Sequence, residues 1–66
     1  MYPAFMRSSY NDCAKFVMWN TGNYKYQIEI VDRITNKVLS TINYSKPYEL
    51  VSKEFDQLAS TSYATG

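Results

Sequence analysis

The chain lacks histidine and has a single cysteine, Cys13, among its 66 residues. One cysteine cannot form an internal disulfide. The absence of histidine excludes histidine-based metal sites, general bases and catalytic triads. We interpret Cys13 as a small apolar residue rather than a reactive thiol, and we expect neither a bound metal nor a cofactor.

Glycine is also scarce, since Gly22 and Gly66 are the only two. The chain therefore has no glycine-rich loop that could hold a phosphate. Its serines have no base to activate them. Glu54 and Asp56 would project from different sides of a helix, so they do not form a catalytic carboxylate pair. We therefore expect a protein that is not an enzyme.

The chain has no long hydrophobic run and no strong excess of charge. No stretch is long enough to cross a membrane, and the first residues lack the pattern of a signal peptide. The net charge is +1, far from the basic excess of a duplex-DNA binder. Six basic and three acidic residues precede Pro47, whereas one basic and three acidic residues follow it. We expect a cytoplasmic protein without membrane contact.

The small size limits how much apolar surface the chain can bury. A domain of this length is marginally stable alone and usually needs a disulfide, a metal or a partner. The first two are missing here. Oligomerisation or binding to another protein is the remaining route to extra buried surface.

Residues 24–44 give the clearest structural pattern, two strand-like runs that flank a turn at 32–37. The first run alternates apolar and polar residues with a period of two. Asp32 can accept backbone N–H bonds inside the turn, and Asn36 suits a left-handed position. Residues 14–19 predict a further strand, joined to residue 24 by a turn in which Gly22 can adopt positive φ.

A helix is predicted to follow the strands and to fade near Ser60. Ser45 is a candidate N-cap, and Pro47 is tolerated in a first helical turn. The apolar residues have helical spacing and form one stripe, which consists of Tyr48, Val51, Phe55, Leu58 and Ala59.

The predicted fold is therefore α+β, a three-stranded antiparallel β-sheet followed by one C-terminal α-helix. Residues 13–60 form the single domain, preceded by an irregular N-terminal arm at 1–12 and followed by a frayed tail at 61–66. The arm is rich in aromatic residues, unlike a disordered segment. We expect it to pack on its own sheet or on a neighbour.

The register decides which side chains share a face of the sheet. Asp32 opposite Lys37 sets Ile30 opposite Leu39, and a turn at Thr21 and Gly22 sets Val17 opposite Tyr26. This register makes both faces substantially apolar. One face carries Val17, Trp19, Tyr24, Tyr26, Ile28, Ile30 and Leu39, and the other carries Ala14, Phe16, Met18, Val31, Val38, Ile42 and Tyr44.

One short helix covers only one face of such a sheet. The N-terminal arm, a second copy of the chain or a binding target could cover the second face. We therefore predict a non-enzymatic interaction module, a homodimer that binds a larger protein stoichiometrically as an inhibitor or adaptor. Small chains of this kind are typical of phage or mobile-element proteins that block host factors. The predicted partner-binding residues are Tyr2, Phe5, Tyr10, Trp19, Arg33 and Tyr44.

Two alternatives stay open. Aromatic rings beside basic groups are typical of single-strand binders, so the chain could bind single-stranded nucleic acid through a sheet face. That face would include Lys15, Lys25, Lys37, Tyr24, Tyr26 and Tyr44. The second alternative is a structural subunit of a larger assembly. A hairpin-plus-helix plan is shared by too many small proteins to decide between these functions.

Overall fold

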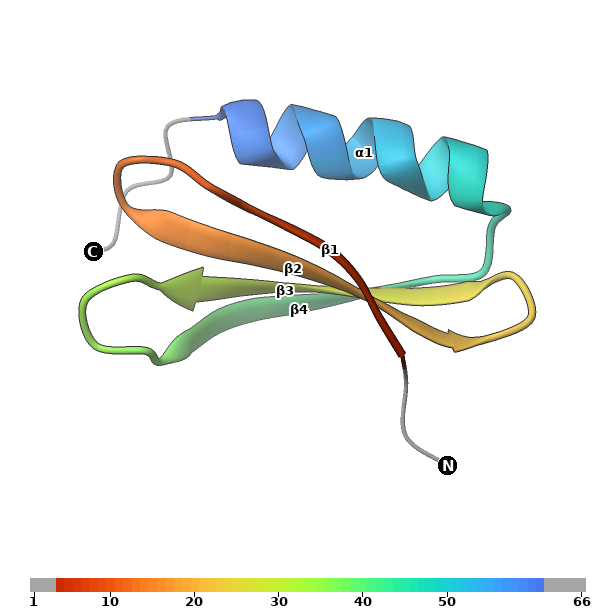
Figure 1. Ribbon diagram of the computed structural model, residues 1–66, viewed down its shortest axis with the longest axis horizontal. Helices are drawn as coiled ribbons and strands as arrows, with labels where there is room; N and C mark the ends of the chain where they lie inside the picture. The colour runs from red at the N-terminus through yellow and green to blue at the C-terminus, as the bar shows by residue number, and fades with distance from the viewer. Residues whose placement is uncertain (1–3, 62–66) are drawn as a thin grey trace.

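The computed structural model describes residues 4–61 as an antiparallel sheet with one helix packed on it (Figure 1). The sheet has four strands in the order β1-β2-β3-β4, so each strand pairs with its neighbours in sequence. The helix α1 packs over the inner strands β2 and β3. The elements are β1 (Ala4–Tyr10), β2 (Ala14–Gly22), β3 (Lys25–Asp32), β4 (Val38–Tyr44) and α1 (Tyr48–Ser60).

The α+β class is confirmed, but the prediction of three strands is wrong because β1 adds a fourth. Residues 1–12 were predicted to form an irregular arm, and β1 lies within them. Its two serines weaken the apolar alternation, and a bulge between Phe5 and Arg7 breaks the period of two. An edge strand is nevertheless held by backbone hydrogen bonds, which do not depend on side-chain pattern. The arm thus extends the sheet at its edge instead of covering a face.

The helix matches its predicted stripe and its predicted end. Val51 and Phe55 are buried, while Leu58 and Ala59 pack against the core. The predicted N-cap is wrong, because Pro47 holds that position and makes no side-chain capping bond. Ser45 lies too far before the first helical turn to cap it.

The turn between β3 and β4 is confirmed in detail. The Asp32 N–H donates to the carbonyl of Lys37 over 2.9 Å, so these two residues face each other as predicted. Asn36 adopts the expected left-handed conformation, with φ of 61°. The Asp32 carboxylate accepts the N–H groups of Ile34 and Thr35, and this closes the loop from inside.

The predicted register beyond this turn is wrong by one residue. Leu39 is an extra residue on β4, opposite the step from Ile30 to Val31 on β3, and this bulge shifts the pairing by one residue. Ile30 therefore faces Ser40 rather than Leu39, and Ile28 faces Ile42. Because side chains alternate along a strand, this shift moves Ile42 to the face of Ile28.

The register of the β2–β3 hairpin also differs from the prediction, and the faces of β2 are exchanged. The turn lies at Asn23 and Tyr24, with Gly22 opposite Lys25 and a bulge after Asn20. Tyr24 has a φ of 53°, which is uncommon for a residue other than glycine. Val17 therefore faces Glu29 instead of Tyr26. The prediction placed Gly22 inside the turn, and the glycine instead ends the strand.

The corrected register concentrates the apolar residues on the face under the helix. The predicted division of apolar residues between the two faces is therefore wrong, although the face without the helix still carries Val17 and Val31, which are buried. The buried core consists of Ala14, Phe16, Met18, Tyr26, Ile28, Ile30, Val51 and Phe55. The opposite face, which we call the helix-free face, is mixed, and its central cross-strand row is Ser8, Val17, Glu29 and Thr41.

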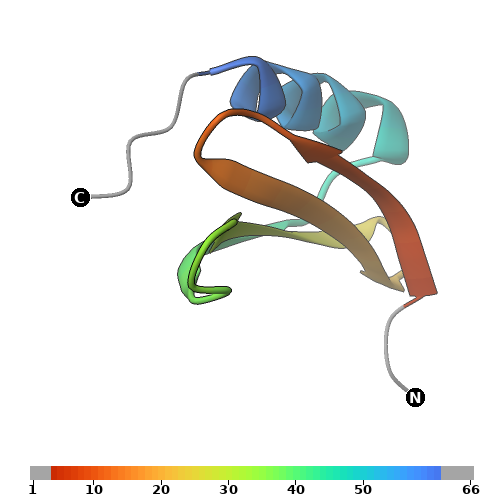
Figure 2. The same cartoon turned by 60° about the vertical axis from the view of Figure 1, so that its left-hand side comes forward.

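The edge strand β1 is fastened to the helix by Arg7. Its guanidinium donates to Ser52 Oγ and forms an ion pair with Asp56, each over 2.7 Å. Figure 2 shows β1 curving toward the helix across the twisted sheet. In the turn after β1, the side-chain Nδ2 of Asn11 donates to the Thr61 carbonyl. The side-chain Oδ1 of Asn11 accepts the backbone N–H groups of Cys13 and Ala14.

Candidate functional site

One end of the helix-free face gathers aromatic, basic and apolar side chains from all four strands, of which Val31 on β3 is buried. The register places one residue of each strand in a single cross-strand row, Tyr10 on β1, Lys15 on β2, Val31 on β3 and Val38 on β4. Paired residues point to the same side of a sheet. The β3–β4 turn lies beside this row and adds Arg33 and Ile34.

Arg33 occupies a fixed position above this end of the sheet. Its guanidinium carbon lies 5.5 Å from the centre of the Tyr10 ring. Its Nη1 group donates to the carbonyl of Asn11, and its backbone N–H donates to the carbonyl of Cys13. A hollow of about 300 Å³ lies here, lined by Tyr10, Lys15, Arg33 and Asn36. We call it the Arg33 hollow.

Apolar side chains of the β3–β4 turn and of β4, at the same end of the sheet, are open to solvent. Ile34 is 90% exposed at the turn, Val38 is 54% exposed and Leu39 is 41% exposed. Leu39 is the extra residue of the bulge on β4 and directly follows Val38. We call the combined region the hairpin-end surface, defined by Tyr10, Lys15, Arg33, Ile34, Val38 and Leu39.

The two cations of this surface differ from others in the described part of the chain. Two other cations of the chain form ion pairs with the helix, Arg7 with Asp56 and Lys46 with Glu54, each at 2.7 Å. Within residues 4–61, neither Lys15 nor Arg33 forms an ion pair. The nearby carboxylate of Asp32 is engaged by the turn. Hydrogen bonds from the Thr35 and then the Ile34 N–H lower the pKa of Asp32, and Lys37 adds to this effect.

Tyr10 and Arg33 are the two predicted partner-binding residues that the structure brings together. Trp19 lies farther along the helix-free face, on the inner strand β2 rather than at a sheet edge. It is half-buried, and its indole Nε1 donates to Glu29 over 2.9 Å. The backbone of Phe5 pairs with that of Trp19. Tyr2 lies outside the described residues.

Tyr44 belongs to the opposite side of the sheet. It faces Tyr26 across the strands and packs against the core, with the Lys46 ammonium 5.7 Å from its ring centre. Burial raises the pKa of Tyr44, and the negative charge of Glu54 adds to the increase. The hydrogen bond to Glu54 raises the pKa of Lys46. Tyr44 is therefore separated from the hairpin-end surface.

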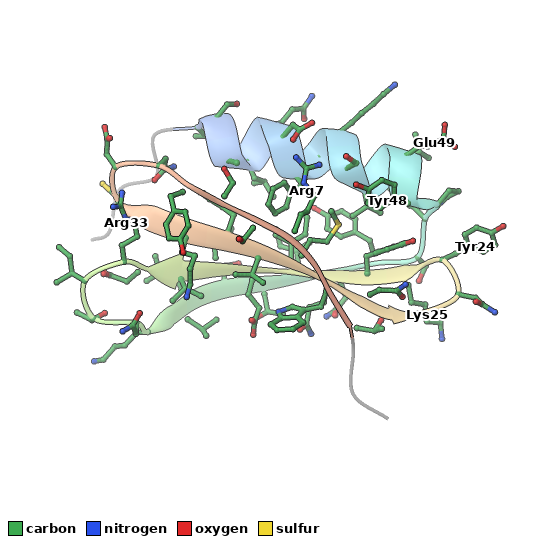
Figure 3. All side chains as sticks on the ribbon, in the orientation of Figure 1. Arg7, Tyr24, Lys25, Arg33, Tyr48 and Glu49 are labelled. Carbon is green, nitrogen blue, oxygen red and sulfur yellow. The ribbon has the colours of Figure 1, made fainter. Side chains whose placement is uncertain are left out.

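The far end of the molecule has a second aromatic group. Tyr24 and Tyr48 are exposed there, and the Tyr48 ring lies 6.0 Å from that of Tyr26. Figure 3 shows Tyr24, Lys25 and Tyr48 at the end of the sheet opposite Arg33. A shallow hollow of about 400 Å³ is lined by Asn20, Gly22, Asn23, Tyr24 and Tyr26.

This arrangement divides the surface proposed for single-stranded nucleic acid. Lys15 is at one end of the sheet, and Tyr24 and Lys25 are at the other end (Figure 3). Tyr26 is buried, and it lies with Tyr44 on the helix side. The rings and the cations of that set therefore do not share one surface.

Sequence reasoning missed Ile34, Val38 and Leu39 as surface residues. One signal was present, because Ile34 is a large apolar residue inside a turn that is otherwise polar. Val38 and Leu39 were assigned to apolar faces, and both are exposed on the edge strand β4.

Other kinds of site have little support in the described part of the chain. No group of three or more histidine, cysteine, aspartate or glutamate residues is placed to hold a metal ion there. The helix comprises 13 residues and is too short and too polar to cross a bilayer.

Comparison with protein-family models, with curated proteins and with solved structures finds no significant match to this chain.

Proposed function

We propose that this protein is a non-enzymatic protein-binding module that uses its hairpin-end surface. It acts by stoichiometric binding to a larger protein, as an inhibitor or adaptor. The observation that carries the proposal is the exposed apolar group at Ile34, Val38 and Leu39, which lies at the same end of the sheet as the Tyr10–Arg33 pair. Exposed apolar patches with polar rims mark interaction sites. Tyrosine and arginine are among the residues that contribute most to interfaces.

The size of the apolar group sets the scale of binding. Full burial of an aliphatic side chain contributes about 1.5–3 kcal/mol. Three partly exposed chains therefore supply on the order of 5 kcal/mol, whereas micromolar binding requires about 8 kcal/mol. The aromatic and basic residues of the surface must supply the remainder, so we expect Tyr10 and Arg33 to contribute to affinity.

The proposal extends to the setting in which such a module acts. A small cytoplasmic protein of this type, encoded by a phage or mobile element, would block a host factor by covering one of its surfaces. Homodimerisation remains a prediction alongside it. Sedimentation equilibrium checks this directly, and a monomeric mass at high protein concentration would contradict the dimer without affecting binding to a larger protein.

The protein-binding proposal is tested by affinity capture from host lysate treated with nuclease. Ile34→Asp is the test variant, because its side chain is 90% exposed and contributes little to folding. Leu50→Asp is the matched control, an equivalent change at an exposed leucine on the helix. We expect wild type and Leu50→Asp to retain the same protein and Ile34→Asp to lose it. Equal capture by all three would contradict the assignment of the surface.

A second candidate function is binding of single-stranded nucleic acid. It is favoured by the exposed Tyr10 ring beside Lys15 and Arg33, which have no ion-pair partner among residues 4–61. Such binding would weaken steeply with salt. Fluorescence anisotropy with oligo(dT) at low salt tests it, and the absence of binding there would eliminate this candidate.

A further inference from the structure

The guanidinium of Arg33 is held in one orientation before any partner arrives. The guanidinium carbon lies 5.5 Å from the centre of the Tyr10 ring. The Nη1 group of Arg33 donates to the Asn11 carbonyl. The backbone N–H of Arg33 donates to the carbonyl of Cys13 in the turn between β1 and β2. The remaining N–H groups of an arginine held in this way keep one direction. Binding a ligand to them therefore costs less conformational entropy.

The Arg33 hollow has cations and an amide in its lining but no carboxylate. Lys15, Arg33 and Asn36 provide hydrogen-bond donors, and Tyr10 provides the aromatic wall. Planar carboxylates match the arginine fork and form charge-assisted hydrogen bonds with it. The residues present are therefore suited to a carboxylate group.

The acidic residues of the chain are mostly engaged elsewhere. Asp32 accepts bonds within its own turn, and Glu29 accepts the indole N–H of Trp19. Glu54 and Asp56 form ion pairs on the helix. Of the remaining acids, Asp12 is exposed without an ion pair and Glu49 lies at the start of the helix, at the far end of the molecule (Figure 3). A second copy of this chain therefore has little acid to offer.

We infer that the Arg33 hollow binds an aspartate or glutamate side chain of the partner protein, so that the partner segment is acidic with apolar flanking residues. This inference rests on the proposed function and specifies the chemistry of its partner. The flanking apolar side chains, Ile34, Val38 and Leu39, fit a peptide better than a phosphate backbone. Among the side chains that the structure describes, the other exposed rings are those of Tyr24 and Tyr48, which lie at the opposite end and cannot stack successive bases beside this hollow.

Isotope-edited NMR titration with capped tripeptides tests the inference. Leu-Asp-Leu is the probe, and Leu-Asn-Leu is its uncharged match. We expect the acidic peptide to shift the amide signals of Lys15, Arg33 and Asn36 in a saturable way, with an affinity about tenfold higher than that of the matched peptide. Arg33→Gln should remove this preference. Lys25→Gln, the same charge change at the far end, should leave it unchanged.

Several outcomes would overturn the carboxylate site. Equal shifts from both peptides would exclude recognition of the carboxylate charge. If Lys25→Gln loses the preference for the acidic peptide as fully as Arg33→Gln does, the preference reflects only the net charge of the protein. If oligo(dT) or inorganic phosphate shifts the same signals at lower concentration, the hollow is a phosphate site instead.

Affinity capture separates this inference from the proposed function. If Ile34→Asp loses the partner while Arg33→Gln keeps it at full strength, the carboxylate site is wrong and the protein-binding function stands. If both variants keep the partner, the proposed function of the surface is wrong. Loss in both, with retention by Lys25→Gln, supports both proposals.

Discussion

The guanidinium carbon of Arg7 lies 4.6 Å from the centre of the Phe55 ring, so an edge-strand cation covers the side of the helix–sheet core. The same guanidinium donates to Ser52 and pairs with Asp56 on the helix. Figure 3 shows Arg7 pointing toward the helix from β1. One side chain thus joins the first strand to the last element.

We predict that Arg7→Ala lowers the free energy of unfolding by about 1–2 kcal/mol. The exposed ion pair and the cation–π contact contribute roughly 0.5–1 kcal/mol each. Urea denaturation followed by circular dichroism measures the change. Lys53→Ala, at an exposed helix lysine that forms no ion pair within the described residues, is the control and should be nearly neutral. Equal effects of the two variants would show that the contacts of Arg7 contribute nothing.

Phe55→Ala should destabilise the protein strongly and lower its melting temperature. Phe55 is fully buried between helix and sheet, and such a truncation costs about 3–5 kcal/mol. That is a large share of the roughly 5–15 kcal/mol that stabilises a small domain. Leu50→Ala, at an exposed position of the same helix, should cost less than about 1 kcal/mol. Thermal melts of both variants check the contrast, and a native melting curve for Phe55→Ala would contradict the position of the core.

Acid should destabilise the protein partly through Asp32. Hydrogen bonds from Thr35 and Ile34 lower the pKa of Asp32 below 3.8 in the folded state. The carboxylate therefore contributes stability above that value, and the contribution is lost as the pH falls through the lower folded-state pKa. Asp32→Asn keeps an oxygen acceptor but does not titrate. We expect wild type to lose its advantage over this variant as the pH falls below about 4. Parallel curves of unfolding free energy against pH would exclude the effect.

Trp19 provides an internal probe of the helix-free face, because it is the one tryptophan in the chain. Its indole N–H bonds to Glu29 across the β2–β3 pair. Glu29→Ala removes this acceptor, and we expect the tryptophan emission to shift to longer wavelength as water reaches the ring. Glu49→Ala on the helix is the matched control and should leave the spectrum unchanged. An unshifted spectrum in Glu29→Ala would show that the bond does not position the indole.

The parts of the fold that local chemistry controls were predictable. The β3–β4 turn followed from Asp32 and Asn36, since each residue satisfies a specific backbone requirement of the loop. The helix stripe followed from the spacing of Val51 and Phe55. These features need no information from distant residues.

The register was not predictable, because bulges leave no clear mark in the sequence. One extra residue at Leu39 and another after Asn20 changed which side chains face the helix. The strand β1 was missed for a similar reason, as it depends on backbone pairing with β2. Nuclear Overhauser contacts between Met18 and Ile28 would verify the corrected register, whereas contacts between Val17 and Tyr26 would restore the predicted one.

The candidate site was predicted only in part. Tyr10 and Arg33 were chosen as an aromatic residue of the arm and as the tip of the hairpin, and they do lie together. Their proximity depends on β1 pairing with β2, which the sequence did not indicate. Tyr44 was chosen as an edge residue and does lie on the edge strand β4, but it packs against the core on the helix side.

The contacts of β1 and the following turn with α1 and Thr61 also suggest an order in which parts of the fold form. Each strand pairs with its sequence neighbour, so the sheet grows through short loops that close in microseconds. Arg7 and Asp56 are 49 residues apart, and Asn11 and Thr61 are 50 apart. Contacts at such separation form only after most of the chain is ordered. We therefore expect the contacts of the helix with the edge strand to form last in folding and to open first.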